Sequence, residues 1–257
     1  MPKFSANLSM LFSELPLLVR FAAAAKAGFA AVEFLFPYAF PPDAIRSKLE
    51  ENNLALAMFN LYPGDFEKGE RGFAVRADRR KEFRASVEQG VQYALKLGCK
   101  KLHAMSGLVP EGAGDVRDLW LGNMRMAADI FAGHDIVLLC EALNPRNNPG
   151  YFLLDQHEAD LLVQKIDRPN ARVQLDIYHA QITNGDLSFL IRKLSGRIGH
   201  VQIASVPDRH EPDEGEINYP HIFAELEAAQ YHDWIGCEYV PRGGTAEGLG
   251  WLADFQA

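Results

Sequence analysis

Four strand-like segments in the second half of the chain each carry a side chain that could bind a metal ion through oxygen. The side chains are Glu141, Asp176, Gln202 and Glu238, in the segments IVLLCE, RVQLD, GHVQIA and WIGCEYV. They are 35, 26 and 36 positions apart, and a strand, a helix and two loops occupy roughly 25–40 residues. The spacing therefore places one ligand on each successive βα unit. Three carboxylates and one amide form an all-oxygen shell that suits Mg²⁺ or Mn²⁺.

The three carboxylates follow apolar runs that should be buried, where a charge is costly unless it is paired or metal-bound. Ion pairs with arginine or lysine at the end of a barrel are the alternative interpretation. Four oxygen-bearing residues in register on consecutive strands favour a metal site. Gln202 is the weakest of them by itself, because a buried glutamine often only satisfies backbone groups. The pattern predicts a metalloenzyme.

Three more residues near these strand ends are candidates for the site. His179 lies three positions after Asp176 and could bind a metal, donate a hydrogen bond to substrate or support a metal ligand. Arg209 and His210, in the charged loop SVPDRHEPDEGEINYP, could bind an anionic group, since the fork of an arginine matches a carboxylate. His103, inside the fourth predicted strand, is as compatible with a core position as with one facing a ligand.

Strand and helix patterns alternate along the chain. Before the four segments above, strands are predicted at 4–8, 31–35, 54–60 and 101–105; helices are predicted at 15–28, 41–52, 79–98, 116–132, 155–166, 186–195 and 219–229, with a short one after Thr245. Asn218, before Tyr219 and Pro220, should cap the helix that follows. Eight regular units favour a closed (β/α)₈ TIM barrel over an open sheet, and no GxGxxG follows the first strand. A length of 257 residues fits one such domain, 1–257. The polar loop 61–78 has no role that the sequence assigns.

Charge, cysteine content and hydrophobic patterning indicate which classes of protein the chain can belong to. With 26 basic and 34 acidic residues the formal charge is −8, which argues against nucleic acid as a partner. Cys99, Cys140 and Cys237 have no paired spacing, which predicts buried free thiols in a reducing compartment. No segment approaches the ~18 apolar residues of a membrane span, and MPKFSANLSML does not look like a signal peptide. We expect a cytoplasmic enzyme that does not bind a membrane; the sequence is compatible with a homo-oligomer without fixing the number of subunits.

Over nearly its whole length the chain resembles the hydroxypyruvate isomerase family of the xylose-isomerase-like barrels. The resemblance lies in FSANLSMLF, GFAAVEFLFPY, NLYPGDFEKGERG, LCEALNP, QLDIYHAQ, HVQIASVPDRHEPDEGEINYP and GCEYVPRG. It implies a divalent metal held by Glu141, Asp176, Gln202 and Glu238, with Glu141 and Glu238 also moving protons. Of the two branches with this pattern, 2-oxo-tetronate isomerase and hydroxypyruvate isomerase, CEALNP and VPDRHEPDEGEINYP favour the first.

The resemblance implies an isomerase that moves the carbonyl of a small hydroxy-oxo acid by one carbon through a metal-stabilised enediolate. Arg209, His179 or both would hold the substrate carboxylate. A sugar 3-epimerase with the same ligands is the main alternative. A nuclease like endonuclease IV would need a histidine-rich multi-metal cluster and a basic face, and a barrel that only binds a ligand would not need the four oxygen ligands.

Overall fold

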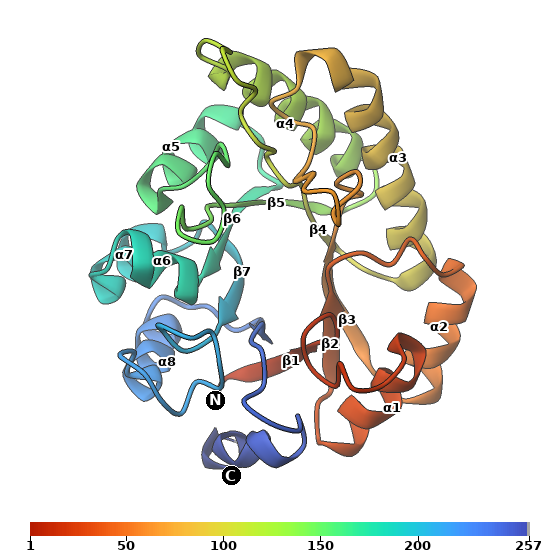
Figure 1. Cartoon of the computed structure of the whole chain (residues 1–257), viewed down its shortest axis with the longest axis vertical. Coiled ribbons are helices and arrows are strands. Elements are labelled where there is room, and N and C mark those ends of the chain that lie inside the picture. Colours follow the sequence, from red (N-terminus) through yellow and green to blue (C-terminus); the bar gives the residue numbers. More distant parts are fainter. Residues whose placement is uncertain (256–257) are drawn as a thin grey trace.

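Eight parallel strands form a closed barrel in the structure, a computed structural model that describes residues 1–255 (Figure 1). The strands are β1 (Lys3–Asn7), β2 (Ala31–Phe34), β3 (Ala55–Asn60), β4 (Lys101–His103), β5 (Val137–Glu141), β6 (Ala171–Asp176), β7 (Ile198–Ile203) and β8 (Trp234–Cys237). Each strand pairs with the next, and β1 pairs with β8 to close the ring. The predicted TIM barrel is confirmed.

Helices surround the barrel as an outer layer (Figure 1). They are α1 (Leu17–Lys26), α2 (Pro42–Glu51), α3 (Arg80–Leu97), α4 (Arg117–Ala132), α5 (Gln156–Ile166), α6 (Ile177–Thr183), α7 (Leu187–Leu194) and α8 (Tyr219–Ala228), with 3₁₀ turns η1 (Ala77–Arg79) and η2 (Glu247–Phe255). The Asn218 side chain accepts the N–H of His221 and caps α8, as predicted. Among residues 1–255 no helix has both the length and the apolar character of a membrane span.

The short helix α6 was not predicted from the sequence. It begins directly after β6, without a loop, and Asp176 caps it by accepting the N–H of Tyr178 at 2.7 Å. Seven residues are too few for a clear helical repeat of apolar side chains. The helix fixes the position of His179 against the end of β6.

The strands are buried on both faces, which explains their apolar runs. The side chains that interrupt these runs lie near the carboxyl ends of β5 to β8. Asp176 pairs in register with Gln202, and Gln202 with Gly236, so that Glu238 lies two residues beyond that level. The strand register therefore brings the predicted ligands to one end of the barrel. The three cysteines are free and buried, as expected.

Candidate active site

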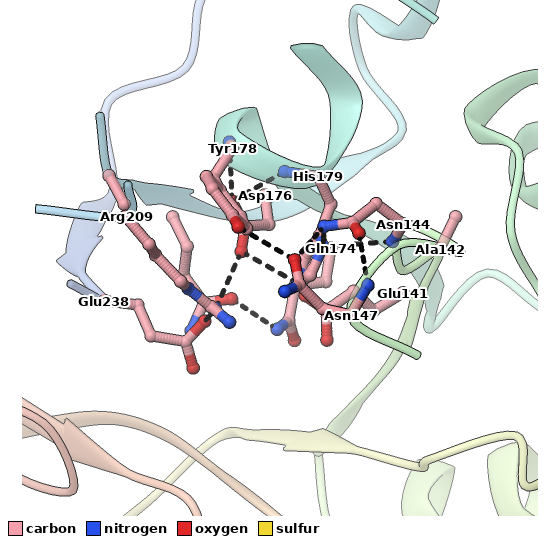
Figure 2. Close-up of polar contacts among 12 residues, drawn as sticks. Glu141, Ala142, Asn144, Asn147, Gln174, Asp176, Tyr178, His179, Arg209 and Glu238 are labelled. Atoms are coloured by element: carbon pink, nitrogen blue, oxygen red, sulfur yellow. Dashed lines mark hydrogen bonds and ion pairs between the residues drawn. The ribbon is translucent and has the colours of Figure 1, made fainter. Parts of the chain in front are cut away.

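Three buried carboxylates gather at the carboxyl end of the barrel. Glu141, Asp176 and Glu238 are each at most 5% exposed. Glu141 and Asp176 offer oxygens that lie, together with a ring nitrogen of His179, within 4.8 Å of one another. Glu238 lies on the other side of Asp176, where Arg209 contacts it (Figure 2). Residues from strands far apart in the sequence thus form one acidic cluster.

The electrostatics of this cluster favour bound protons or a bound cation. Burial, reinforced by the charges of Glu238 and Asp176, raises the pKa of Glu141 well above its ordinary value. Burial also raises the pKa of Glu238 to about 8, although Arg209 opposes the shift. Carboxyl groups with such raised pKa values concentrate at sites of proton transfer and ion binding.

Arg209 is the counter-ion of the acidic cluster. Its Nη2 lies 2.5 Å from Glu238 Oε2 and 3.4 Å from Asp176 Oδ2, and its guanidinium lies 4.9 Å from the centre of the Tyr178 ring (Figure 2). Burial alone would lower the pKa of Arg209, but the charges of Glu238 and Asp176 raise it. The sequence predicted that Arg209 binds the substrate. In the structure it also neutralises part of the charge of Glu238 and Asp176.

The hydrogen bonds of His179 fix its tautomer. Its Nδ1 accepts the backbone N–H of Asn144 at 3.0 Å, so the single proton of a neutral ring is on Nε2. Burial lowers the pKa of His179 to about 4, which keeps the ring neutral. Nε2 lies 3.5 Å from Asp176 Oδ2. A protonated nitrogen has no free lone pair for a metal, so of the three predicted roles this geometry favours that of a hydrogen-bond donor.

Gln202 is held by two hydrogen bonds inside the barrel. Its Nε2 donates to Glu33 Oε1 at 2.8 Å, and its Oε1 accepts from Gln174 Nε2 at 2.6 Å. Burial alone would raise the pKa of Glu33, but His200 and the hydrogen bonds lower it. An ionised Glu33 can only accept hydrogen bonds, so the amide nitrogen of Gln202 faces it and the amide oxygen points away. That oxygen has a second lone pair that could bind a cation. The role of Gln202 as a metal ligand stays a prediction.

A polar cluster around Glu33 supports these ligands, and the sequence analysis missed it. Glu33 accepts hydrogen bonds from Ser5 Oγ at 2.8 Å, Asn7 Nδ2 at 3.2 Å and His200 Nε2 at 2.8 Å. Asn7 also reaches Glu238 Oε1 at 3.3 Å. A Cβ at position 236 would collide with the Glu33 carboxylate, which explains the glycine there. The available signals were a glutamate inside AVEFL and a histidine inside GHVQ.

A cavity of about 110 Å³ opens above the acidic cluster. Glu141, Glu238, His179 and Arg209 line it on the side of β5 to β8. Two residues of the loop 61–78, Phe66 and Arg71, also line it. The cavity has room for a small molecule.

The structure places the two remaining candidate histidines differently. His103 lines the cavity, with Nδ1 3.2 Å from Asn60 Oδ1 and 3.6 Å from Glu141 Oε2, and burial lowers its pKa to about 3. It is therefore a neutral side chain that faces the site. The His210 ring lies 2.7 Å from the carbonyl oxygen of Val240 and is not among the residues that line the cavity. Substrate binding by His210 stays a prediction.

The donor set fits a divalent cation. The three carboxylates carry more negative charge than Arg209 can balance, and oxygen donors are what Mg²⁺ and Mn²⁺ prefer. Glu141 and Asp176 already lie close together. Glu238 accepts a hydrogen bond from Arg209, and the amide oxygen of Gln202 uses one of its two lone pairs, on Gln174.

Comparisons with known proteins agree with the observed fold. A family model described as a xylose isomerase-like TIM barrel matches residues 21–255. The chain is 51% identical, over 98% of its length and 97% of the relative's, to a 2-oxo-tetronate isomerase of Pectobacterium atrosepticum. It is 40% identical, over 100% of both chains, to a hydroxypyruvate isomerase of Escherichia coli.

Solved structures show the same barrel. A Brucella melitensis protein, described as an AP endonuclease of family 2, has a TM-score of 0.97 and 53% identity, with 100% of both chains covered. A D-psicose 3-epimerase of Clostridium cellulolyticum has a TM-score of 0.79 and 18% identity, covering 97% of this chain and 89% of the other. The second likeness shows the fold alone.

Proposed function

Because the chain belongs to the xylose isomerase-like TIM barrel family, and within it to the 2-oxo-tetronate and hydroxypyruvate isomerases, we propose that it isomerises a small hydroxy-oxo acid. Of the two substrates, 2-oxo-tetronate is preferred in this proposal. The observation that supports this preference most strongly is the 51% identity, over nearly the full length, to a 2-oxo-tetronate isomerase. The acidic cluster beside a small cavity supports it independently.

The proposed reaction needs one group that takes a proton from carbon and one that returns a proton to the neighbouring carbon. Glu141 and Glu238 enter the cavity from β5 and from the residue after β8, so they can act on different sides of a substrate. One carboxylate removes the proton from the hydroxylated carbon, and the resulting enediolate receives a proton on the former carbonyl carbon from the other. The hydroxyl proton passes to the former carbonyl oxygen. In the metal-free protein, burial raises the pKa of Glu238 to about 8, so that its carboxyl group can hold a proton near neutral pH.

A bound Mg²⁺ or Mn²⁺ ion would stabilise the charge that develops on the two substrate oxygens. In this proposal Glu141, Asp176, Gln202 and Glu238 hold the ion. Asp176 would do so with Oδ2, because its Oδ1 caps α6. The His179 Nε2–H would donate to a substrate oxygen.

Without metal, the protein should lose stability as the pH rises from about 5 to 8. The folded protein keeps the proton of Glu238 up to a pKa of about 8, whereas an unfolded chain releases it near 4.5. The contribution of Glu238 to the free energy of unfolding is therefore complete below about pH 4.5 and is lost as the pH approaches about 8. Glu141 shifts in the same direction. We expect Tm of the metal-free protein to fall by about 5 °C or more across this range, since 1 kcal/mol corresponds to about 2–4 °C at this size.

Calorimetry at a series of pH values, with chelator and then with Mn²⁺, measures this effect. The added cation should restore Tm most strongly at the alkaline end. A metal-free Tm that stays level or rises between pH 5 and 8 would contradict the proposed burial of these carboxylates. The variant Glu238→Gln, which cannot titrate at this position, should show a flatter dependence on pH.

His179→Gln separates the role of a hydrogen-bond donor from that of a metal ligand. We expect kcat to fall about tenfold or more, since a hydrogen bond to a charged group is worth roughly 1.5–3 kcal/mol. Mn²⁺ affinity, measured by calorimetric titration, should fall less than in Asp176→Asn, because His179 lies beside Asp176 Oδ2 without binding the ion itself. Asp176→Asn is the matched comparison and should weaken Mn²⁺ binding. Equal loss of Mn²⁺ affinity in both variants would identify His179 as a ligand.

Steady-state kinetics on three substrates tests the proposed function. The purified protein with Mg²⁺ would be offered 2-oxo-tetronate, hydroxypyruvate and a neutral ketose of equal length. We expect the highest kcat/KM for 2-oxo-tetronate. Turnover of the neutral ketose alone would refute the proposal.

A nuclease is the second candidate, because the 53% identical Brucella melitensis protein was described as one. Two observations argue against it for this chain. The net charge of −8 does not favour a polyanion. Across residues 1–255, metal-binding side chains gather in one group, which contains a single histidine. Incision of abasic DNA by the same preparation would decide in favour of the nuclease.

A further inference from the structure

We propose that Arg71, in the loop 61–78, binds the substrate carboxylate and makes the enzyme specific for acids. This inference rests on the proposed function and assigns a role to a loop that the sequence left without one. Arg71 lines the same cavity as Glu141 and Glu238, together with Phe66 of the same loop. A substrate whose oxygens face the cluster would extend its carboxylate toward this loop.

Arg71 is fixed by contacts that leave one edge of its guanidinium free. Nη1 donates to the carbonyl oxygens of Phe66 and Glu70, both at 2.9 Å. The guanidinium lies 3.8 Å from the centre of the Phe66 ring, and that ring packs on Phe36 at 5.0 Å. Within residues 1–255 neither Nε nor Nη2 of Arg71 has a hydrogen-bond partner. These two nitrogens form the edge that binds a carboxylate through two parallel hydrogen bonds.

The same edge holds carboxylates elsewhere in this protein. Arg76 uses Nε and Nη2 on the two oxygens of Asp78, at 3.1 and 2.9 Å. Arg197 uses the same pair on Asp160, at 2.5 and 3.2 Å. Arg71 presents this edge without a carboxylate on it among the described residues.

The charge of Arg71 is also uncompensated, which distinguishes it from its neighbours. Lys68 pairs with Asp65, Arg76 with Asp78, and Arg79 with Glu70. In the described part of the chain no carboxylate lies within ion-pair distance of Arg71. A half-buried cation beside a cavity, with nothing to neutralise it, favours an anionic ligand.

Arg209, the other arginine that lines the cavity, is engaged differently. Its guanidinium bridges Glu238 and Asp176. Those two carboxylates already use its charge, so less of that charge is available to an incoming anion. Arg71 has no such competitor, and it is therefore the residue that should separate acids from neutral sugars.

The loop is built to hold Arg71 in place. The N–H of Gly72 donates to the carbonyl oxygen of Pro63 at 2.9 Å, and the N–H of Val75 to that of Ser106 at 3.1 Å. Gly72 has a φ of 106°, and a Cβ there would collide with the carbonyl group of Met105, two residues after β4. The chain directly after Arg71 is thus bound to the loop itself and to the segment that follows β4. A receptor fixed in advance loses little entropy when it binds a ligand.

The test compares Arg71→Gln with Arg76→Gln, which removes the same charge from the same loop away from the cavity. For 2-oxo-tetronate and hydroxypyruvate, Arg71→Gln should raise KM about tenfold or more, as expected for a lost charge-assisted pair. Its kcat/KM for a neutral ketose should change less than about twofold, and Arg71→Lys should recover part of the loss because it keeps the charge without the fork. Arg76→Gln should behave as the wild type.

Malonate, a small dicarboxylate, supplies a measurement that does not depend on turnover. Calorimetric titration should show malonate binding about tenfold weaker in Arg71→Gln and unchanged in Arg76→Gln. If Arg71→Gln unfolds, the partial recovery in Arg71→Lys and its malonate affinity decide the question. Equal losses on acid and neutral substrates, or unchanged malonate binding, would overturn the role of Arg71 while leaving the isomerase intact. A wild type that converts no acid would refute the proposed function itself.

Discussion

Replacing either Glu141 or Glu238 with glutamine is expected to reduce kcat by about 10³-fold or more while the barrel remains folded. Both side chains line the cavity, and both have pKa values raised by burial. An amide of the same shape can neither take nor give the proton that the reaction moves. It also binds a divalent cation more weakly than a carboxylate does.

The two glutamine variants would be assayed at saturating Mg²⁺, so that weakened metal binding does not account for the loss. Circular dichroism and Tm would show whether the fold is kept. Glu227→Gln, at a position 67% exposed in its side chain, is the matched control and should retain full activity. Either variant that keeps most of its turnover with metal bound would exclude that residue as acid or base.

Removal of divalent metal is the second change from which we expect a large effect. After dialysis against a chelator, turnover should fall by about 10³-fold or more, since a bound ion contributes several kcal/mol to the stabilisation of developing charge. Mg²⁺ or Mn²⁺ should restore it at about one ion per chain, because the acidic cluster forms one site. Metal content measured by mass spectrometry, beside the rate, checks both points. Full activity at a metal content far below one ion per chain would contradict the proposal.

The barrel could be predicted because its signals are local and repeated. Buried parallel strands give apolar runs, and the helices between them have their own period and capping residues, such as Asn218 before α8. Glu141 and Asp176 could be identified because each ends such a run. Their convergence follows from the architecture, because the carboxyl ends of all strands meet on one face.

The contacts inside the site could not be predicted in the same way. The pairing of Arg209 with Glu238 joins a loop after β7 to the residue after β8, and charge alone does not say which carboxylate an arginine contacts. The Glu33–His200 pair crosses the barrel from β2 to β7. Arg71 lies in a loop without periodicity, where only coordinates show which side chain faces the cavity.

The most direct test of the central proposal is to follow the carbonyl carbon itself. The purified protein with Mg²⁺ would be incubated in D₂O with 2-oxo-tetronate labelled with ¹³C at the carbonyl carbon, and the reaction observed by ¹³C NMR. The isomerase predicts that the labelled ketone signal is replaced by that of a hydroxylated carbon coupled to deuterium, while the neighbouring carbon becomes the ketone. A label that remains a ketone while the neighbouring carbon exchanges its proton for deuterium and the solution loses its optical rotation would identify inversion at that carbon and contradict the proposed reaction.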